Sequence, residues 1–318
     1  MQLAFLIDPL ASLKPKKDSS LALMVEAARR GHQVSIFELG DVSLENGAIF
    51  AQATALRVAQ EVLTSSTVSP HVVPLGPARR VSIEQFDRVF IRKDPPFDSQ
   101  YLALTYLLDR PGHDGRFINA PRGIREVNEK LFATRYVALT PQTLVTWSFE
   151  EALRFARQYE KVVLKPSYFG SGKGVSLSSH ADPAFQETFA GTLALEPIGP
   201  VLVQQYLPEG KGGDTRVMLL DGVPVAVVGR RPAPGEFRAN IALGGEAVAV
   251  EIRPEQRRIA SEIGTQLAQL GILFAGLDFI GDKLIEINVT SPTLMQELRR
   301  VSGFDMAARI LDRVETGV

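Results

Sequence analysis

Hydrophobic residues near the start of the chain gather in short runs that are separated by longer amphipathic stretches. The runs "LAFLI" (3–7) and "VSIFEL" (34–39) are typical of buried strands. Between them, residues 18–33 have helical periodicity, with Asp18 or the serine after it as N-cap and a glycine at the C-terminal end. This order predicts a βαβ unit.

Two further apolar runs extend this first domain. The runs "RVFIRK" (88–93) and "RFINAP" (116–121) predict strands, and residues 99–110 between them have a helical pattern. Residues 62–82 are rich in Ser, Thr, Val and Pro, which predicts a loop or irregular excursion. We therefore expect an open α/β domain in this part of the chain.

The pattern changes after this domain. Helices are predicted over 124–136 and over 148–159, the second with a serine N-cap and a glutamate three residues later. The runs "KVVLKP" (161–166) and "VLVQQYL" (201–207) predict strands on either side of a glycine-rich turn.

The last third of the chain predicts two hairpins. One has the Asp-Gly turn of "LDGVPV" (220–225), and the other covers 275–289. A polar loop (231–245) and a helix (254–271) lie between them. We expect three domains, an N-terminal α/β domain, a central lobe with the glycine-rich turn and a C-terminal lobe, at 1–122, 123–204 and 205–318.

The composition restricts the function classes. A chain of 318 residues is too long for one core of usual size. A formal net charge of -1 predicts no nucleic-acid partner and no acidic-membrane surface. The lack of cysteine excludes disulfides and thiolate chemistry, and the four histidines have no metal-ligand spacing. Without a signal-peptide pattern or a run of about 20 apolar residues, we expect a soluble, cytoplasmic protein with no membrane partner.

Polar side chains interrupt the strand "LIEINVTSPT" (284–293). Glu286 and Asn288 are two residues apart, so they point to one face of the strand, and Asp278 lies across the hairpin. Buried carboxylates are costly, and a hard cation such as Mg²⁺ would remove that cost. The alternative is an ion pair of Asp278 with Arg216 or Arg230.

The hairpin turn decides whether the two carboxylates share a face. A two-residue turn at Gly281-Asp282 would place Asp278 and Glu286 on opposite faces. We therefore predict a three-residue loop over 281–283, or an equivalent bulge, with Gly281 or Asp282 relieving the strain of the turn.

The segment "KPSYFGSGKGV" (165–175) resembles a flap over phosphates, because its alternating glycines permit positive φ and expose backbone N–H groups. It lacks the Ser or Thr of a Walker A motif, and a flexible hairpin is the alternative. Lys165 ends an apolar run, where a structural lysine is uncommon. Lys130 in "NEKLF" could likewise contact phosphates. Helical periodicity favours the other interpretation, a solvated residue on a helix surface.

Two other patterns could bind a nucleotide or an anion. The segment "VQQYLP" ends a strand whose backbone could contact an adenine edge, with a plain edge strand as the alternative. Arg92, Arg216 and Arg230 end or interrupt apolar runs, which suits bidentate binding of carboxylate or phosphate. The alternative is that these arginines are ordinary solvent-exposed residues on the surface.

These residues together resemble the ATP-grasp ligases, and closely the bacterial-type glutathione synthetases. The resemblance runs almost from end to end, and "KKDSS", "RKDPPFD" and "EINVTSPT" are its most specific motifs. It implies the ATP-grasp fold, an α/β protein with an N-terminal open α/β (pre-ATP-grasp) domain and two α+β lobes that hold ATP between them.

The resemblance also implies roles for individual residues. Arg216 and Arg230 would stabilise the acyl phosphate and the tetrahedral intermediate, and Asp278, Glu286 and Asn288 would hold two Mg²⁺ ions, with Mn²⁺ as a substitute. ATP would be bound by Lys130, Lys165, Gly170, Gly172, Gly174, Gln204, Gln205, Tyr206, Leu207 and Asp214. The substrates would be bound by Arg92, Asn240, Ser291 and Thr293. Lys173 departs from the family pattern, which has adjacent glycines in the flap.

The implied reaction joins γ-glutamylcysteine and glycine to give glutathione, ADP and phosphate through an acyl phosphate. It requires no side-chain nucleophile, which agrees with the lack of cysteine. A homo-oligomer, either a dimer or a tetramer, is implied by the same resemblance. Two alternatives stay open: an ATP-grasp ligase for another acid and amine, and a non-catalytic nucleotide-binding regulator.

Overall fold

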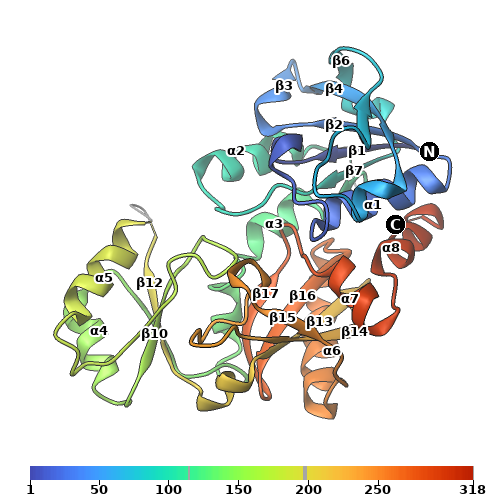
Figure 1. The fold of residues 1–318 in the computed structure, drawn as a ribbon. Coiled ribbons are helices and arrows are strands. Elements are labelled where there is room, and N and C mark those ends of the chain that lie inside the picture. Colours follow the sequence, from blue (N-terminus) through green and yellow to red (C-terminus); the bar gives the residue numbers. More distant parts are fainter. Residues whose placement is uncertain (114, 196–198, 318) are drawn as a thin grey trace.

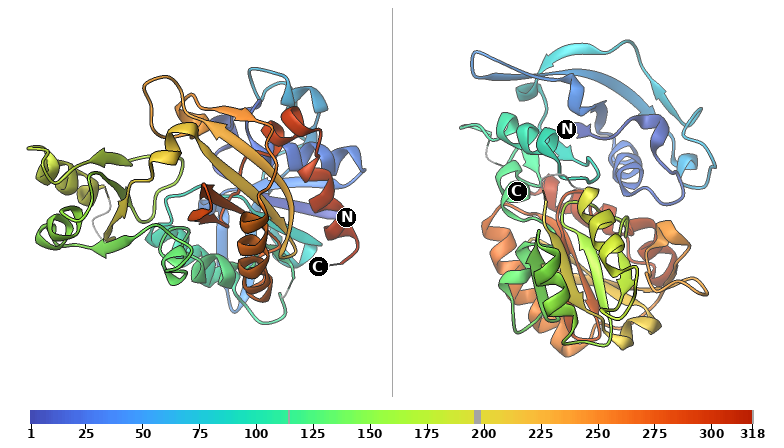
Figure 2. Two further views of the ribbon diagram at one scale, coloured as in Figure 1. Left: turned by 90° about the horizontal axis from the view of Figure 1, so that it is seen from below. Right: turned by 90° about the vertical axis from the view of Figure 1, so that its left-hand side faces the viewer.

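The computed structural model describes residues 1–113, 115–195 and 199–317 as three β-sheets with their helices (Figure 1). The N-terminal domain lies above the C-terminal lobe in this view, and the central lobe projects to one side. The central lobe again lies to one side of the other two when seen from below (Figure 2). Among the described residues, no helix is long and apolar enough to cross a bilayer.

The predicted βαβ unit is confirmed. Strands β1 (Gln2–Leu6) and β2 (Gln33–Phe37) pair in parallel, and α1 (Ser19–Arg29) connects them with Asp18 as its side-chain N-cap. Strand β7 (Arg88–Ile91) pairs in parallel with β1 on its other side. The hydrogen bond from the Leu21 N–H to the Asp18 side chain fixes the point where the loop after β1 enters α1.

The rest of this sheet differs in part from the prediction. Helix α2 (Ser99–Leu108) is confirmed, and β8 (Phe117–Ile118) is shorter than the run that predicted it. The predicted loop or irregular excursion over 62–82 is wrong at β5 (Val72–Pro74) and β6 (Arg79–Ser82), which pair with a strand missed in the sequence. Residues 64–71 and 75–78 have no helix or strand. That strand, β4 (Ala48–Val58), also pairs with β2 and with β3 (Val42–Glu45).

The predicted helix over 124–136 is also wrong. The structure has α3 (Pro121–Glu126) and a separate 3-10 helix (Phe132–Arg135). Between them, the side chain of Asn128 accepts hydrogen bonds from the backbone N–H groups of residues 130 and 131, which competes with helix formation. The break leaves the carbonyl of Glu129 free to accept from the N–H of Ile287 on the C-terminal sheet.

The central lobe is an antiparallel sheet with two helices. Its strand order is β11-β10-β12-β9, and aromatic side chains of α4 (Phe149–Ala156) and α5 (Phe185–Ala194) form its small core with the sheet. Ser148 caps α4 as predicted. The strands are β9 (Thr143–Thr146), β10 (Val162–Pro166), β11 (Ser176–Ser178) and β12 (Val201–Gln205).

The C-terminal lobe is a five-stranded antiparallel sheet in the order β15-β14-β13-β16-β17. Helix α6 (Pro254–Gln269) packs against β13 and β14, and both predicted hairpins are confirmed. The strands are β13 (Asp214–Leu220), β14 (Val223–Arg231), β15 (Glu246–Val248), β16 (Phe274–Ile280) and β17 (Lys283–Asn288).

The chain returns to the N-terminal domain at its end. Helices α7 (Met295–Ser302) and α8 (Met306–Glu315) pack on α1, and their apolar residues share one core with β1 and α1. The loop between β17 and α7 therefore runs along the boundary of the two domains. The domain limits at 122 and 204 stay a prediction.

Candidate active site

The β16–β17 hairpin brings the predicted carboxylates to one face. Asp278 is the cross-strand neighbour of Glu286, although the turn has only two residues and pairs Ile280 with Lys283. The three-residue loop is therefore wrong, but the equivalent bulge is confirmed, with Ile285 as the extra residue. Gly281 has a φ of +59°, as the tight turn requires.

Asp278 lies in a buried cluster of charges on three neighbouring strands. Arg216 donates from Nε and Nη2 to its two carboxylate oxygens, at 2.7 and 2.8 Å, and Arg230 donates to one of them at 2.8 Å. Arg230 also donates to both oxygens of Asp214, at 2.6 and 2.8 Å. Of the two alternatives for Asp278, the structure shows the ion pair, and it involves both arginines.

The charge state of Asp278 follows from these contacts. Burial alone would raise the pKa of its carboxyl, but the charges and hydrogen bonds of Arg216 and Arg230 outweigh burial and hold that pKa well below its ordinary value. Asp278 is therefore an ionised carboxylate near neutral pH.

The two predicted lysines lie on the other side of the cluster. Lys130 is buried, forms an ion pair with Glu286 at 2.8 Å and donates to the carbonyl of Phe169 in the flap. The reading of Lys130 as a solvated helix residue is therefore wrong, because a partner 156 residues away decides its environment. Lys165 donates to Gln204 Oε1 at 2.7 Å, and burial lowers the pKa of its ammonium group to about 8.

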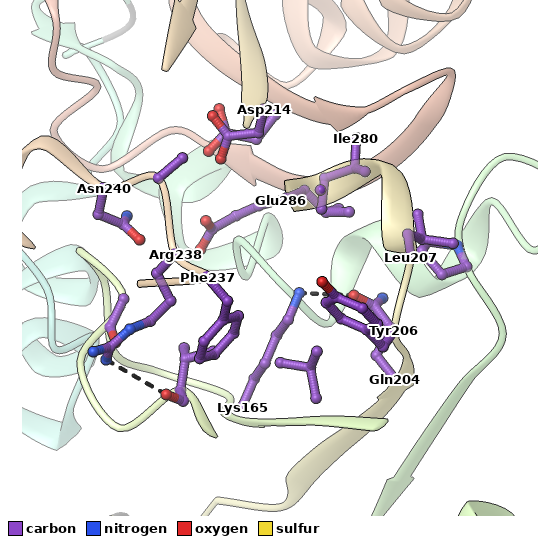
Figure 3. Close-up of a pocket in the computed structure, with 18 of the residues that line it drawn as sticks. Lys165, Gln204, Tyr206, Leu207, Asp214, Phe237, Arg238, Asn240, Ile280 and Glu286 are labelled. Carbon is purple, nitrogen blue, oxygen red and sulfur yellow. Dashed lines mark hydrogen bonds between the residues drawn. The ribbon is translucent and has the colours of Figure 1, made fainter. Parts of the chain in front are cut away.

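A pocket lies between the central and C-terminal lobes. Figure 3 shows Lys165 extending from β10 toward Gln204, with Asp214 and Glu286 on the C-terminal lobe and Phe237 beside the lysine. The predicted ATP-binding residues that line this pocket are Lys130, Lys165, Gly172, Gln204, Gln205, Tyr206, Leu207 and Asp214. Sequence analysis missed its apolar walls, Val163, Phe237, Ile280 and Ile285, which carry no polar signal.

The glycine-rich flap covers one side of this pocket. Gly172 and Gly174 have positive φ as expected, but Gly170 does not, and Ser171 has the positive φ instead, at 57°. A Cβ on Gly172 would lie 2.5 Å from Asn240 Oδ1, so the flap and the loop over 232–245 are in close contact. Arg238 of that loop donates to the carbonyl of Gly172 at 3.1 Å.

A second cavity, which we call the substrate cleft, lies between the flap, the N-terminal domain and the β17–α7 loop. It shares Arg230, Asn240 and Glu286 with the first pocket, so the two are neighbours across these side chains. Other predicted residues on its walls are Gly170, Arg216, Asn288, Ser291 and Thr293.

Two predicted residues line neither cavity. Gly174 belongs to the far end of the flap, where a Cβ would lie 2.4 Å from Leu195. Arg92 lies behind the wall of the substrate cleft, where it donates to Ser20 Oγ and to the carbonyl of Pro292, both at 3.1 Å. Binding roles for these two residues stay predictions.

Glu129 is a cleft residue that sequence analysis missed. Its buried carboxylate accepts hydrogen bonds from the N–H groups of Val289 and Thr290 and from the Thr290 hydroxyl, at 3.1, 3.2 and 2.7 Å. Burial, followed by the charge of Glu286, raises the pKa of this carboxyl. Its position next to Lys130 in "NEKLF" was the signal that could have identified it.

The donor set of the β16–β17 hairpin suits a hard divalent cation in its chemistry. Two carboxylates and the amide of Asn288 project from one face and offer oxygen ligands. Both carboxylates already have cationic partners, and the described residues contain no group of three or more His, Asp or Glu in metal-binding reach. A cation would therefore have to replace Arg216, Arg230 or Lys130 at these oxygens.

Comparison with known families covers both parts of the chain. Residues 1–125 match the model "Prokaryotic glutathione synthetase, N-terminal domain", and residues 129–303 match "Prokaryotic glutathione synthetase, ATP-grasp domain". The glutathione synthetase of Synechococcus elongatus is 38% identical, over 99% of this chain and 98% of that protein. The glutathione synthetase of Escherichia coli is 36% identical, over 99% and 98%.

Solved structures with low sequence identity share the fold. A D-cycloserine synthetase superposes with a TM-score of 0.66 at 15% identity, over 98% of both chains. A RimK-domain ATP-grasp protein of Sphaerobacter thermophilus has a TM-score of 0.60 at 17% identity, over 99% of this chain and 100% of that one. The ATP-grasp fold is thereby confirmed, and the chain belongs to the prokaryotic glutathione synthetase family.

Proposed function

We propose that this protein is an ATP-dependent ligase that joins γ-glutamylcysteine and glycine, and forms glutathione, ADP and phosphate. The observation that carries this proposal is the shared wall of the two cavities. Arg230, Asn240 and Glu286 face both the pocket between the lobes and the substrate cleft. A γ-phosphate in the first cavity and a substrate carboxylate in the second would therefore meet at these residues.

The pocket between the lobes is the proposed ATP site. Residues 204–207, at and just after the end of β12, and the apolar walls suit a purine, and Asp214 is suited to the ribose. Lys130 and Lys165 would contact the phosphates, since both ammonium groups lie beside the wall that the two cavities share.

Asp278, Glu286 and Asn288 would hold two Mg²⁺ ions, or Mn²⁺ in their place. Such ions, when bound, neutralise charge on phosphate oxygens. Arg216, Arg230 and Lys130 are paired with these carboxylates, so their release would free three cationic side chains for phosphate and carboxylate oxygens. The ion pairs would in this way keep the arginines in position until the ligands bind.

Catalysis then rests on position and electrostatics rather than on a side-chain nucleophile. The cysteinyl carboxylate attacks the γ-phosphorus, the bond to ADP breaks, and an acyl phosphate forms. The glycine amine attacks the acyl carbon and loses a proton, and phosphate leaves as the peptide bond forms. Arg216 and Arg230 would stabilise the negative charge on the acyl phosphate and on the tetrahedral intermediate.

Phosphate release measured with each substrate omitted in turn tests the proposal. We expect release that requires ATP, γ-glutamylcysteine and glycine together. Release with another acid or amine, but not with this pair, would favour the alternative of a different ATP-grasp ligase. Alanine is expected to be a poor acceptor, because the 232–244 loop and Ser291–Thr293 would exclude its β-carbon. Nucleotide binding without any turnover would favour the regulator.

We also propose a cytoplasmic homo-oligomer, either a dimer or a tetramer. This proposal rests on the resemblance to the family. Light scattering coupled to size-exclusion chromatography tests the assembly, and a monomer at micromolar concentration would contradict it.

A further inference from the structure

The substrate cleft has two ends with different chemistry. One end contains Arg216, Arg230 and Glu286 and adjoins the ATP pocket. The other end is formed by the loop over 12–18 and by the start of α7. The proposed reaction occurs at the first end, so the second end is available to recognise the part of the substrate that does not react.

Glu297 on the first turn of α7 stands out at this second end. Its side chain is 2% exposed and belongs to the cleft wall. Oε1 accepts a hydrogen bond from Arg300 at 3.1 Å, whereas Oε2 is buried without a hydrogen-bond partner among the described residues. A buried carboxylate oxygen without a partner is costly, so the arrangement indicates that a cationic ligand completes it.

The electrostatic surroundings of Glu297 indicate that nearby cations do not fully compensate its charge. Burial raises the pKa of its carboxyl, and the charge of Arg300 does not compensate for burial. Lys17, the other nearby cation, donates from its ammonium group to the carbonyl of Ile241 at 3.3 Å. The last torsion of a glutamate side chain is soft, so the carboxylate can turn toward a ligand in the cleft at little cost.

Polar groups of both signs lie beside this carboxylate. Lys14, Lys17 and Asp18 line the same end of the cleft. The side chain of Gln296 donates to the carbonyls of Pro15 and Asp18, both at 2.7 Å, and so fixes this loop against α7. An ammonium and a carboxylate on one carbon, the head of an α-amino acid, fit such a mixture of charges.

We propose that Glu297 binds the free α-ammonium group of the γ-glutamyl residue, and that it thereby selects acids that carry an unmodified amino-acid head. This inference rests on the proposed function, because it names the part of the peptide substrate that this end recognises. Glycine is the other source of an ammonium group. The glycine nitrogen must have a free lone pair when it attacks the acyl carbon. A buried carboxylate would oppose this because it would stabilise the protonated, ammonium form.

The test compares γ-glutamylcysteine with glutarylcysteine, which lacks only the α-ammonium group. In the wild-type protein, we expect kcat/KM for γ-glutamylcysteine to exceed that for glutarylcysteine about 10- to 100-fold. Glu297→Gln should lower kcat/KM for γ-glutamylcysteine by about the same factor, leave that for glutarylcysteine within about twofold, and leave the KM for glycine unchanged. A purely structural role would lower both values equally and keep their ratio.

Two further variants separate the explanations. Arg300→Met removes the partner of Oε1. We expect this variant to keep most of the selectivity ratio, which is kcat/KM for γ-glutamylcysteine divided by kcat/KM for glutarylcysteine. Glu262→Gln, an exposed glutamate of α6, is the matched control and should change neither value. If Glu297→Gln fails to fold, Glu297→Asp keeps the charge but shortens its reach, and the loss should again be confined to γ-glutamylcysteine.

The outcomes distinguish this inference from the proposed function. Wild-type turnover of γ-glutamylcysteine and glycine with an unchanged selectivity ratio in Glu297→Gln would overturn the ammonium site alone. A raised KM for glycine in that variant would assign the carboxylate to glycine instead and also overturn it. Absence of wild-type turnover with either acid would overturn the proposed function and the inference together.

Discussion

Two buried carboxylates, Asp278 on the pocket between the lobes and Glu297 on the wall of the substrate cleft, have opposite surroundings. Asp278 receives three hydrogen bonds from two arginines, and all three donors are within 2.8 Å. Glu297 receives one hydrogen bond from another side chain, at 3.1 Å, and its second oxygen has no partner in the described residues. Both side chains are almost fully buried, so burial alone does not explain the difference.

The difference indicates two ways to prepare a site for a charged ligand. At the reaction end, carboxylates hold cationic side chains in position, and the ligand would exchange these partners. At the recognition end, one oxygen of the Glu297 carboxylate has no hydrogen-bond partner among the described residues, and the ligand would supply it. Removing a carboxylate that two buried arginines share should therefore be costly for the fold, whereas removing one whose cationic partner is exposed should not.

The largest effect is expected for Asp278→Asn. The change leaves two buried guanidinium groups without their shared anion, which should lower the free energy of unfolding by about 3–5 kcal/mol and abolish turnover. Urea unfolding followed by circular dichroism measures the first effect. A fully stable Asp278→Asn protein would contradict the view that this ion pair is a structural element.

The lysines of the reaction end should have the next largest effect. Lys130→Ala and Lys165→Ala should each remove a charge-assisted contact of about 1.5–3 kcal/mol and so weaken ATP binding about 10- to 150-fold. Isothermal titration calorimetry with a non-hydrolysable ATP analogue measures the dissociation constant of each variant. Lys161→Ala, at an exposed position just before β10, is the control and should bind normally. Normal affinity in either site variant would remove that lysine from the phosphate site.

Burial of Lys165 also predicts a pH dependence. Its pKa is lowered to about 8, so the side chain is charged below that pH and loses its charge as the pH rises through it. We expect the KM for ATP to rise between about pH 7.5 and 9 and the rise to be reduced in Lys165→Met. A wild-type KM for ATP that stays constant across this range would show that phosphate binding does not depend on the charge of Lys165.

The smallest effect is expected at the recognition end. Glu297→Gln removes a buried charge that has only one partner, so the free energy of unfolding should change by less than about 1 kcal/mol. Thermal unfolding beside Asp278→Asn makes the comparison direct. A loss as large as that of Asp278→Asn would show that the two carboxylates are equivalent.

Local signals in the sequence predicted much of the fold. Asp18 as N-cap, Ser148 as N-cap and the Asp-Gly turn before β14 depend on neighbouring residues alone, and all three are confirmed. The alternation of Glu286 and Asn288, combined with the need for Asp278 on the same face, predicted the hairpin bulge without its position. Short-range hydrogen bonds explain why these features could be predicted.

Other features depend on contacts that the sequence does not show. Strands β5 and β6 are edges of a sheet whose central partner, β4, was itself missed. The helix over 124–136 breaks at Asn128, and the residues after the break bind β17 instead. Lys130 is buried because Glu286 is its partner, and the missing partner of Glu297 becomes visible only when the whole cleft is assembled.

Metal binding tests the exchange of partners at the reaction end most directly. Mn²⁺ bound by the protein can be counted by electron paramagnetic resonance, with and without a non-hydrolysable ATP analogue. We predict that the wild-type protein binds Mn²⁺ tightly only with the nucleotide, and that Glu286→Gln loses this binding while its circular dichroism spectrum shows a folded protein, although the loss of the partner of Lys130 lowers its stability. Equal nucleotide-dependent Mn²⁺ binding in the wild type and in Glu286→Gln would contradict the account.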